Sequence, residues 1–387
     1  MRIAYLGAAA WILCSTIAHA GGVERSNQFL GPLFEPGHYL ELRYGHVSPS
    51  ITGTDLPLGP YPGGERTGDV AASYNSFGFA YKHQFDEFWS AAIIMDQPFG
   101  ADLAYPTSGS LNLGGTGVVI NNTDLTGIIR FAVPESGFGV HAGLRSARTD
   151  GHVSLSGASF GPVNGYRVDV DRDTAYGWLA GVSWERPDIA ARVSLTYNAV
   201  IEHDFDISES GPLVDPDGPG PAPALPLLDG RSSLTVKTPK SWNLEFQTGI
   251  DPETLIFGGV RWVDWSGFRV DPERLVEVTG SGLVDLDDTT TFTIGVGRKF
   301  TDTWSGAASF TYEKSGNELV SPLAPVNGQK GISVAATYTQ DRIKITTGVS
   351  YIKLGDALPE TGTPDTARAE IEGSHAWGVG VRVGYSF

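Results

Sequence analysis

The final segment of the chain alternates strictly between apolar and polar positions. Apolar side chains occupy every second position: Trp377, Val379, Val381, Val383, Tyr385 and Phe387. A period of two predicts a β-strand with one apolar face. In a soluble sandwich that face would point to a core, and the chain would seldom end on it with Phe. We therefore expect a strand whose apolar face meets lipid, as in an outer-membrane barrel.

The same alternation recurs upstream and predicts fourteen strands. They span residues 38–48, 70–84, 88–100, 120–133, 136–149, 173–186, 188–205, 230–248, 253–270, 288–301, 303–316, 329–340, 342–355 and 370–387. Tight turns and long loops alternate between them, which is typical of bacterial outer-membrane barrels and not of soluble sandwiches. The pattern predicts an all-β fold, a 14-stranded antiparallel transmembrane β-barrel over residues 38–387.

Composition and charge narrow the class of protein. The 387 residues include 44 acidic and 27 basic side chains, a formal net charge of −17. This balance argues against a nucleic-acid partner, because a phosphate backbone would be repelled. No segment after the N-terminus approaches the roughly 18 consecutive apolar residues of a transmembrane helix. In a membrane the chain must therefore form a closed barrel, since only helices and barrels satisfy every backbone group there.

The N-terminus has the pattern of a secretory signal peptide. Arg2 is followed by an apolar run from Ile3 to Ile17 and then by a small-x-small site ending at Ala20. The run is shorter than the ~20 residues that span a bilayer, so we predict a signal peptide over residues 1–20 and not a membrane anchor. The single cysteine, Cys14, lies within it, which would leave the mature chain without disulfides.

Residues 21–37 precede the first strand and show no strand pattern. Fourteen strands should leave a lumen that needs filling, because eight leave room only for side chains and sixteen enclose an aqueous channel. We expect this stretch, with Phe34, Glu35, Pro36 and Gly37, to form a short hatch or plug in the lumen. A loose periplasmic tail is the alternative.

Two prolines stand inside predicted strands. Pro98 is followed by Phe99 and Gly100, and Pro239 lies between Thr238 and Lys240. Proline cannot donate a ladder hydrogen bond, and glycine often marks bulges and bends. We predict a local break in the wall at Pro98, through which an apolar ligand would leave sideways into lipid. The alternative is that each proline only marks a strand end near the rim.

Several segments resemble the FadL-type outer-membrane transporters of long-chain fatty acids and related hydrocarbons. They are residues 192–205, 234–242, 260–266 and 371–387. The resemblance implies a 14-stranded barrel with an N-terminal hatch in the outer membrane of a Gram-negative cell. It also implies passive transport through an inward kink of the third strand, here Pro98, Phe99 and Gly100. The closing strand with Tyr385 and Phe387 resembles the signal read by the barrel-assembly machinery. The family's hatch is longer and carries an Asn-Pro-Ala motif, which this chain lacks.

A fatty acid needs an apolar groove for its tail and cations for its carboxylate. Arg145, Lys237 and Arg261 stand at lumen-facing positions of the alternation. Arg148 lies near the place where the resemblance implies a cation for the ligand head. We take these four as carboxylate-binding candidates and Phe99 with the interior aromatics as tail contacts. Pairing of the cations with lumen acids is the alternative.

The sequence favours a transporter over other classes of protein. No His-Glu-x-x-His, Gly-x-Ser-x-Gly or phosphate-loop motif occurs, and we predict no enzyme activity, cofactor or metal. A general diffusion porin is the main alternative, and an outer-membrane lipid hydrolase or adhesin is a further one. We expect a monomer that interacts with a long-chain fatty acid or other hydrophobic small molecule, outer-membrane lipid and the barrel-assembly machinery.

Overall fold

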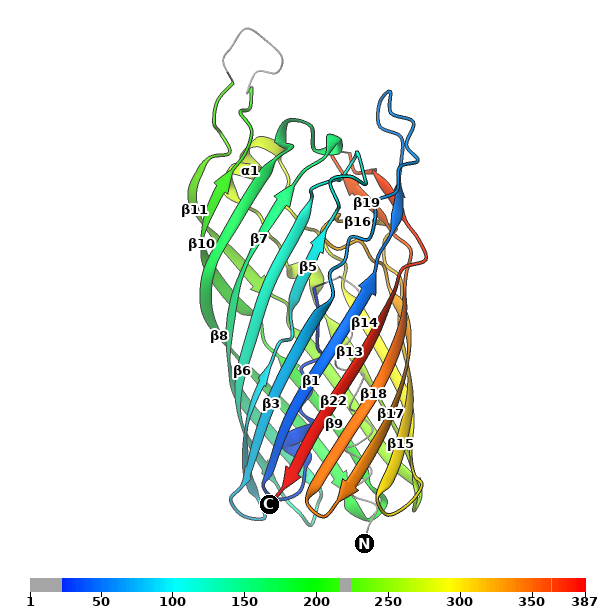
Figure 1. Ribbon diagram of the computed structural model, residues 1–387. Coiled ribbons are helices and arrows are strands. Elements are labelled where there is room, and N and C mark those ends of the chain that lie inside the picture. Colours follow the sequence, from blue (N-terminus) through cyan, green and yellow to red (C-terminus); the bar gives the residue numbers. More distant parts are fainter. Residues whose placement is uncertain (1–22, 216–223, 363) are drawn as a thin grey trace.

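A computed structural model describes residues 23–215, 224–362 and 364–387. Within these residues the chain forms one closed antiparallel β-barrel (Figure 1). The predicted signal peptide, residues 1–20, lies outside the described residues. In the described ranges no helix is long and apolar enough to cross a membrane.

In the described parts of the chain, seventeen strands form the wall of the barrel. They are β1 (Tyr39–Ser50), β3 (Tyr74–Gln84), β4 (Trp89–Asp96), β5 (Gly100–Ala104), β6 (Gly117–Ala132), β7 (Phe138–Leu155), β8 (Tyr166–Arg186), β9 (Ala191–Asn198), β10 (Ile201–Ser210), β11 (Gly230–Thr238), β12 (Ser241–Asp251), β13 (Thr254–Val263), β14 (Thr289–Lys299), β15 (Trp304–Glu313), β17 (Gln329–Gln340), β18 (Ile343–Leu354) and β22 (His375–Ser386).

Three passages of the chain along the wall are each broken into two strands: β4 with β5, β9 with β10, and β11 with β12. Counting each passage as one stave, the barrel has 14 staves, which confirms the number predicted from the alternation. Each stave pairs with the next one in sequence. The barrel closes where β1 pairs with β22, from Tyr39 opposite Ser386 to Ser50 opposite His375.

Over most of the wall the apolar row faces outward. On β22, Trp377 and Val379 are exposed, whereas Ala376 and Arg382 are buried. Aromatic rings pair across neighbouring strands within the outward row, as Trp377 does with Tyr351 at 4.8 Å between ring centroids. An outward apolar band with aromatic residues is the surface that a lipid bilayer requires. The alternation predicted from the sequence is present, with small and charged residues on the lumen side.

The alternation reverses on β10 and β11. On β10, Phe205 and Ile207 are buried, while Asp204 and Asp206 are exposed. Strand β11 repeats this pattern, with buried Val236 between exposed neighbours. Charged side chains are expensive on a lipid-facing surface, so these two strands rise above the apolar band, with water outside and an apolar interior.

The long loops contain short elements of their own. They are β2 (Gly53–Asp55), β16 (Leu319–Val320), β19 (Leu358–Thr361), β20 (Thr366–Ala367), β21 (Ala369–Ile371), the helix α1 (Glu273–Thr279) and the 3-10 helices η3 (Ala158–Val163) and η5 (Trp265–Gly267). Two further 3-10 helices are η2 (Gly31–Phe34) and η4 (Pro187–Ile189). They lie outside the long loops, before β1 and in the turn between β8 and β9. The long loops lie at the extracellular end of the barrel, opposite the tight turns (Figure 1).

One predicted strand is shorter than the sequence suggests. The alternation predicts a strand over 253–270, but β13 ends at Val263 and α1 lies in the following stretch, which is predicted as a loop. The neighbouring stave breaks at Pro239, so β13 loses its partner at this level. Among the described residues, the last backbone hydrogen bond between the two staves is donated by the N–H of Asp264 to the carbonyl of Lys240, at 3.1 Å.

The segment from Val23 to Gly37 runs inside the barrel (Figure 1). Leu33 is fully buried, and Phe29 is nearly so. Leu30 and Leu33 pack against inward-facing side chains of four staves, namely Ala80, Ala92, Ile94, Ile128 and Leu179. We call this segment the N-terminal segment below.

Candidate functional site

The extracellular half of the lumen encloses an apolar pocket. It contains about 910 Å³ of empty space, part of it open to solvent. Strands β5 to β8, β10 and β11 supply its walls, with side chains such as Ile120, Val153, Val170, Phe205 and Val236. A concave site with a largely apolar lining is typical of small-molecule binding.

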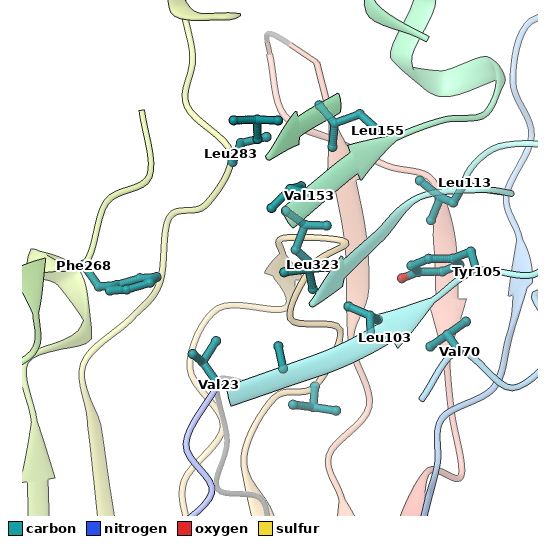
Figure 2. Packing of buried hydrophobic residues seen from close by; sticks show 14 of the residues in the cluster. Val23, Val70, Leu103, Tyr105, Leu113, Val153, Leu155, Phe268, Leu283 and Leu323 are labelled. Atoms are coloured by element: carbon teal, nitrogen blue, oxygen red, sulfur yellow. The ribbon is translucent and has the colours of Figure 1, made fainter. Parts of the chain in front are cut away.

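Loop residues close over the pocket. Trp265 and Phe268 follow β13, Leu283 precedes β14, and Leu323 lies between β15 and β17. Figure 2 shows Phe268, Leu283 and Leu323 entering this cluster from separate segments of the chain. Trp265 is fully buried and meets the ring of Phe99 edge-on at 5.9 Å between centroids. The sequence pattern places Trp265 and Phe268 in the predicted strand 253–270. It indicates no role for Leu283 and Leu323, because an isolated apolar residue in a long loop has no period.

The break in the third stave brings Phe99 into the pocket. Between β4 and β5 the wall pairs with the N-terminal segment. The carbonyl of Pro98 accepts from the N–H of Arg25 at 2.8 Å, and the N–H of Gly100 donates to the carbonyl of Val23 at 2.8 Å. These bonds replace ladder bonds that the bend removes, so the kink and the N-terminal segment form one unit.

The same break opens the ladder between the second and third staves. Strands β3 and β4 pair up to Phe79 opposite Met95. The next backbone hydrogen bond between the second and third staves is accepted by the carbonyl of Asp102. Between these points the N–H of Phe77 donates to the side-chain oxygen of Gln97 at 3.0 Å. The wall is therefore held by a side chain where a backbone ladder would otherwise run.

Arg25 of the N-terminal segment lies at this opening. Its guanidinium carbon is 4.3 Å from the centroid of the Tyr74 ring. The same group lies against Gly100, where an added Cβ would come within 2.7 Å of it. A second cavity, with about 600 Å³ of empty space, is lined by these three residues and shares Ala101 and Leu323 with the apolar pocket. The pocket and the wall opening thus adjoin across the kinked stave.

A second stretch of wall also lacks a ladder. Strand β8 pairs with β10 up to Val170 and with β9 from Leu179, so residues 171–177 have no backbone pairing with the next stave among the described pairs. A side-chain bond spans this stretch, from Nδ1 of His203 to the carboxylate of Asp173 at 2.9 Å. His203 also lines the apolar pocket. The sequence pattern predicts one continuous strand over 188–205 and does not indicate the unpaired stretch beside it.

Two of the four predicted carboxylate-binding cations lie in the lumen but pair with acids of the protein. Arg145 is buried and donates to Asp124 at 2.5 Å. Arg261 is buried, pairs with Glu24 of the N-terminal segment and donates to Asn243 at 2.6 Å. Neither arginine lines the apolar pocket. The structure therefore places both of them in contacts that hold the lumen together.

The other two predicted cations lie on the outer face. Lys237 is exposed and within 3.0 Å of the carboxylate of Glu202. Its prediction as a lumen-facing residue was wrong, because β11 turns the apolar row of Leu234 and Val236 inward. Arg148 on β7 is exposed as well. The four predicted cations are thus not brought together around one ligand position.

The four predicted hatch residues lie at the periplasmic end of the N-terminal segment. The ring of Phe34 is 4.5 and 5.1 Å from the guanidinium carbons of two wall arginines. The carboxylate of Glu35 is buried, 3.5 Å from Nζ of Lys344. Pro36 and Gly37 are exposed, and Gly37 has a φ of +64° where the chain turns toward β1, a conformation that glycine adopts readily.

The C-terminal pair lies at the periplasmic rim. The rings of Tyr385 and Phe387 are 4.9 Å apart and nearly perpendicular. Phe387 is exposed, and its N–H donates to the carbonyl of His38 at 3.1 Å. The role of these two residues as an assembly signal stays a prediction.

The extracellular mouth is strongly acidic. An open cavity there is lined by one lysine and by the acids Asp285, Asp287, Asp288, Glu313, Glu318, Glu360 and Asp365. Partial burial, with Asp365 and Asp285 nearby, raises the pKa of Glu360. Among the described residues no group of three or more His, Cys, Asp or Glu side chains could hold a metal ion.

The family comparison agrees with this architecture. Residues 67–387 match the model of a family described as outer membrane protein transport protein (OMPP1/FadL/TodX). The chain belongs to this family. A FadL homologue of Pseudomonas aeruginosa superposes with a TM-score of 0.72 at 18% identity, covering 92% of both chains. A comparison with curated proteins gives no significant match.

Two solved toluene transporters have the same fold as this FadL/TodX-family member. TodX of Pseudomonas putida has a TM-score of 0.65 at 14% identity, covering 92% of both chains. TbuX of Ralstonia pickettii has a TM-score of 0.59 at 12% identity, covering 92% of this chain and 90% of its own. The family consists of outer-membrane proteins that transport hydrophobic compounds and not of enzymes. The resemblance found in the sequence is therefore confirmed at the level of the family.

Proposed function

We propose that this FadL/TodX-family barrel takes up hydrophobic small molecules passively, binds them in the apolar pocket and releases them sideways through the kinked third stave. One observation carries the proposal. Phe99 lines the pocket and belongs to the break that opens the wall. Binding site and exit are therefore parts of a single segment, with the second cavity directly beyond it.

Within this class we place uncharged compounds ahead of long-chain fatty acids. No Lys or Arg side chain is among the residues that line the described pocket. A carboxylate would be desolvated there without a cation, which is strongly unfavourable. The acidic mouth would also repel an anion before it entered. Neutral molecules, such as aromatic hydrocarbons, meet neither obstacle.

Exit requires movement of Arg25. Its guanidinium stacks on Tyr74 and lies against Gly100, within the opening between the second and third staves. The contact with the ring is a cation–π interaction, worth roughly 0.5–2 kcal/mol, so thermal motion can break it. The compound would pass from the pocket, across Ala101, into the second cavity and then into the outer leaflet.

Replacing Pro98, Phe99 and Gly100 together by Val, Thr and Val tests the lateral exit. The new sequence can continue the ladder between β4 and β5. We expect uptake of labelled toluene by cells expressing the variant to fall to the level of cells without the protein. The control is Pro134→Val, which changes a proline in the tight turn between β6 and β7, away from the pocket, and should keep most of the uptake. Unchanged uptake by the triple variant would contradict lateral exit.

The competing function is a general diffusion porin. The N-terminal segment occupies the lumen, with Leu33 fully buried and Glu24 paired to Arg261, so we expect no steady aqueous current. Reconstitution in planar bilayers measures this directly. Large and stable single-channel currents from the intact protein would favour the porin over the hydrophobic transporter.

A further inference from the structure

The apolar pocket contains two buried polar atoms without a partner in the described part of the chain. They are Nε2 of His203 and Nε1 of Trp265. Both side chains line the pocket, and their exposed fractions are 1% and 0%. An unsatisfied polar atom in an apolar site is costly, and such atoms in native proteins call for an explanation.

The two atoms have defined hydrogen-bonding roles. The carboxylate of Asp173 only accepts, so Nδ1 of His203, 2.9 Å away, carries the hydrogen. In the neutral imidazole, Nε2 is then an acceptor. The ring lies nearly parallel to that of Phe205, at 5.1 Å between centroids and 8°, which together with Asp173 fixes its orientation. The indole N–H of Trp265 is a donor only.

Of the other polar side chains that line the pocket, those of Asn122, Thr149, Asp150 and Thr238 are already engaged. Asn122 donates to Asp124 and to Thr149, and the hydroxyl of Thr238 bonds to the backbone of Ile201. Asp150 pairs with Arg172 outside the pocket. His152 also lines the pocket, but it is only half-buried and has no buried polar atom without a partner. His203 and Trp265 are therefore the lining groups, among those described, that hold such an atom.

We propose that the pocket recognises an uncharged hydrophobic compound carrying a hydroxyl group, held by Nε2 of His203 and the indole N–H of Trp265. A hydroxyl donates one hydrogen bond and accepts others, so it complements both atoms in an otherwise apolar site. A plain hydrocarbon leaves both atoms unsatisfied, and a carboxylate finds an acceptor in His203 and no lysine or arginine. This inference rests on the proposed function, because it assumes that the transported compound occupies this pocket.

Three ring compounds that differ in one substituent test the preference: toluene, p-cresol and p-toluate. Their binding to the full-length protein in lipid nanodiscs is measured by equilibrium dialysis with labelled compound, and nanodiscs without protein are subtracted. We expect p-cresol to bind about tenfold more tightly than toluene, the size of one net hydrogen bond. p-Toluate should bind most weakly.

The variants His203→Phe and Trp265→Phe each keep an aromatic ring and remove one of the two polar atoms. Each should cut the preference for p-cresol over toluene, taken as the ratio of the two affinities within the same variant, by about threefold or more. The matched control is His152→Phe, the same substitution at another histidine of the same pocket, which should keep the preference. Circular dichroism verifies that each variant retains the barrel.

Three results would overturn the proposal. They are equal affinity of the unaltered protein for p-cresol and toluene, tightest binding of p-toluate, and loss of the preference in His152→Phe to the same extent as in His203→Phe. Absence of binding by all three compounds would contradict the proposed function of the pocket itself, and the hydroxyl preference with it. Binding of toluene and p-cresol with equal affinity would leave the proposed function standing and remove only the preference.

Discussion

The two halves of the lumen have opposite chemistry. The extracellular half holds an apolar pocket whose lining contains no lysine or arginine among the described residues. The periplasmic half is filled by the N-terminal segment, whose acids Glu24 and Glu35 face wall cations such as Arg261 and Lys344. The same barrel interior thus combines an apolar pocket with an N-terminal segment held by charge.

This contrast explains where the lumen cations belong. Buried charges are stable only when they are paired and hydrogen-bonded, and Arg145 and Arg261 have such partners in Asp124 and Glu24. An arginine that is already paired to a buried acid is a poor receptor for an incoming carboxylate. Charge in this lumen therefore holds the N-terminal segment and the wall together, and the ligand contacts that we propose fall to apolar side chains and a few polar atoms.

The largest effect should come from removing an ion pair in the charged, periplasmic half of the lumen. Arg261→Leu leaves the carboxylate of Glu24, which is 1% exposed, without its partner. Loss of one member of a buried pair costs about 3–5 kcal/mol, so the N-terminal segment should detach. Limited trypsin digestion followed by mass spectrometry should then show cleavage after Arg25 at least about tenfold faster than in the unaltered protein.

A double variant controls for this result. Replacing both Glu24 and Arg261 by Leu removes the two charges together, and such exchanges are often close to neutral. Protection of Arg25 should therefore largely return. Equal digestion of Arg261→Leu and the unaltered protein would show that the ion pair does not hold the segment.

A smaller effect is expected when charge is placed in the apolar half. Val236 lines the pocket and is 7% exposed. In Val236→Arg the guanidinium must stay near the pocket mouth or be desolvated, so the affinity for toluene should fall about tenfold or more. Binding of p-toluate should rise, because the pocket would now offer a cation. Val236→Leu, which keeps the pocket apolar, is the control, and unchanged selectivity in Val236→Arg would contradict the assigned pocket.

The sequence pattern predicts the barrel well, because alternation is a property of each strand alone. It identifies the number of staves, the outward face of β22 and the position of Pro98 between β4 and β5. It does not indicate the break at residues 199–200, where neither proline nor glycine stands. That break lies beside Pro239 of the next stave, since Ile201 pairs with Thr238. Its cause is therefore a neighbouring stave and not the local sequence.

The candidate site was predicted less well for two physical reasons. A period of two assigns residues to two faces but does not say which face is inside, and on β11 the apolar row turns inward above the membrane. Lys237 was placed on the wrong side for this reason. Trp265, Phe268 and Leu323 from loops also complete the pocket. The ring of His203 is oriented by its hydrogen bond to β8, which leaves Nε2 without a partner. Such encounters between distant segments leave no periodic signal in the chain.

The smallest effects separate charge-based from apolar recognition. Lys237 and Arg148 are exposed on the outer face, and Lys237 forms a surface ion pair with Glu202. Surface pairs contribute about 0–1 kcal/mol, so Lys237→Ala and Arg148→Ala should alter stability by less than about 1 kcal/mol. Dialysis in nanodiscs should give affinities for toluene and p-toluate within about twofold of the unaltered protein, because neither side chain reaches the pocket. A selective loss of p-toluate binding in either variant would mean that an outer-face cation reaches the ligand, and the division between a charged periplasmic half and an apolar extracellular half would then fail.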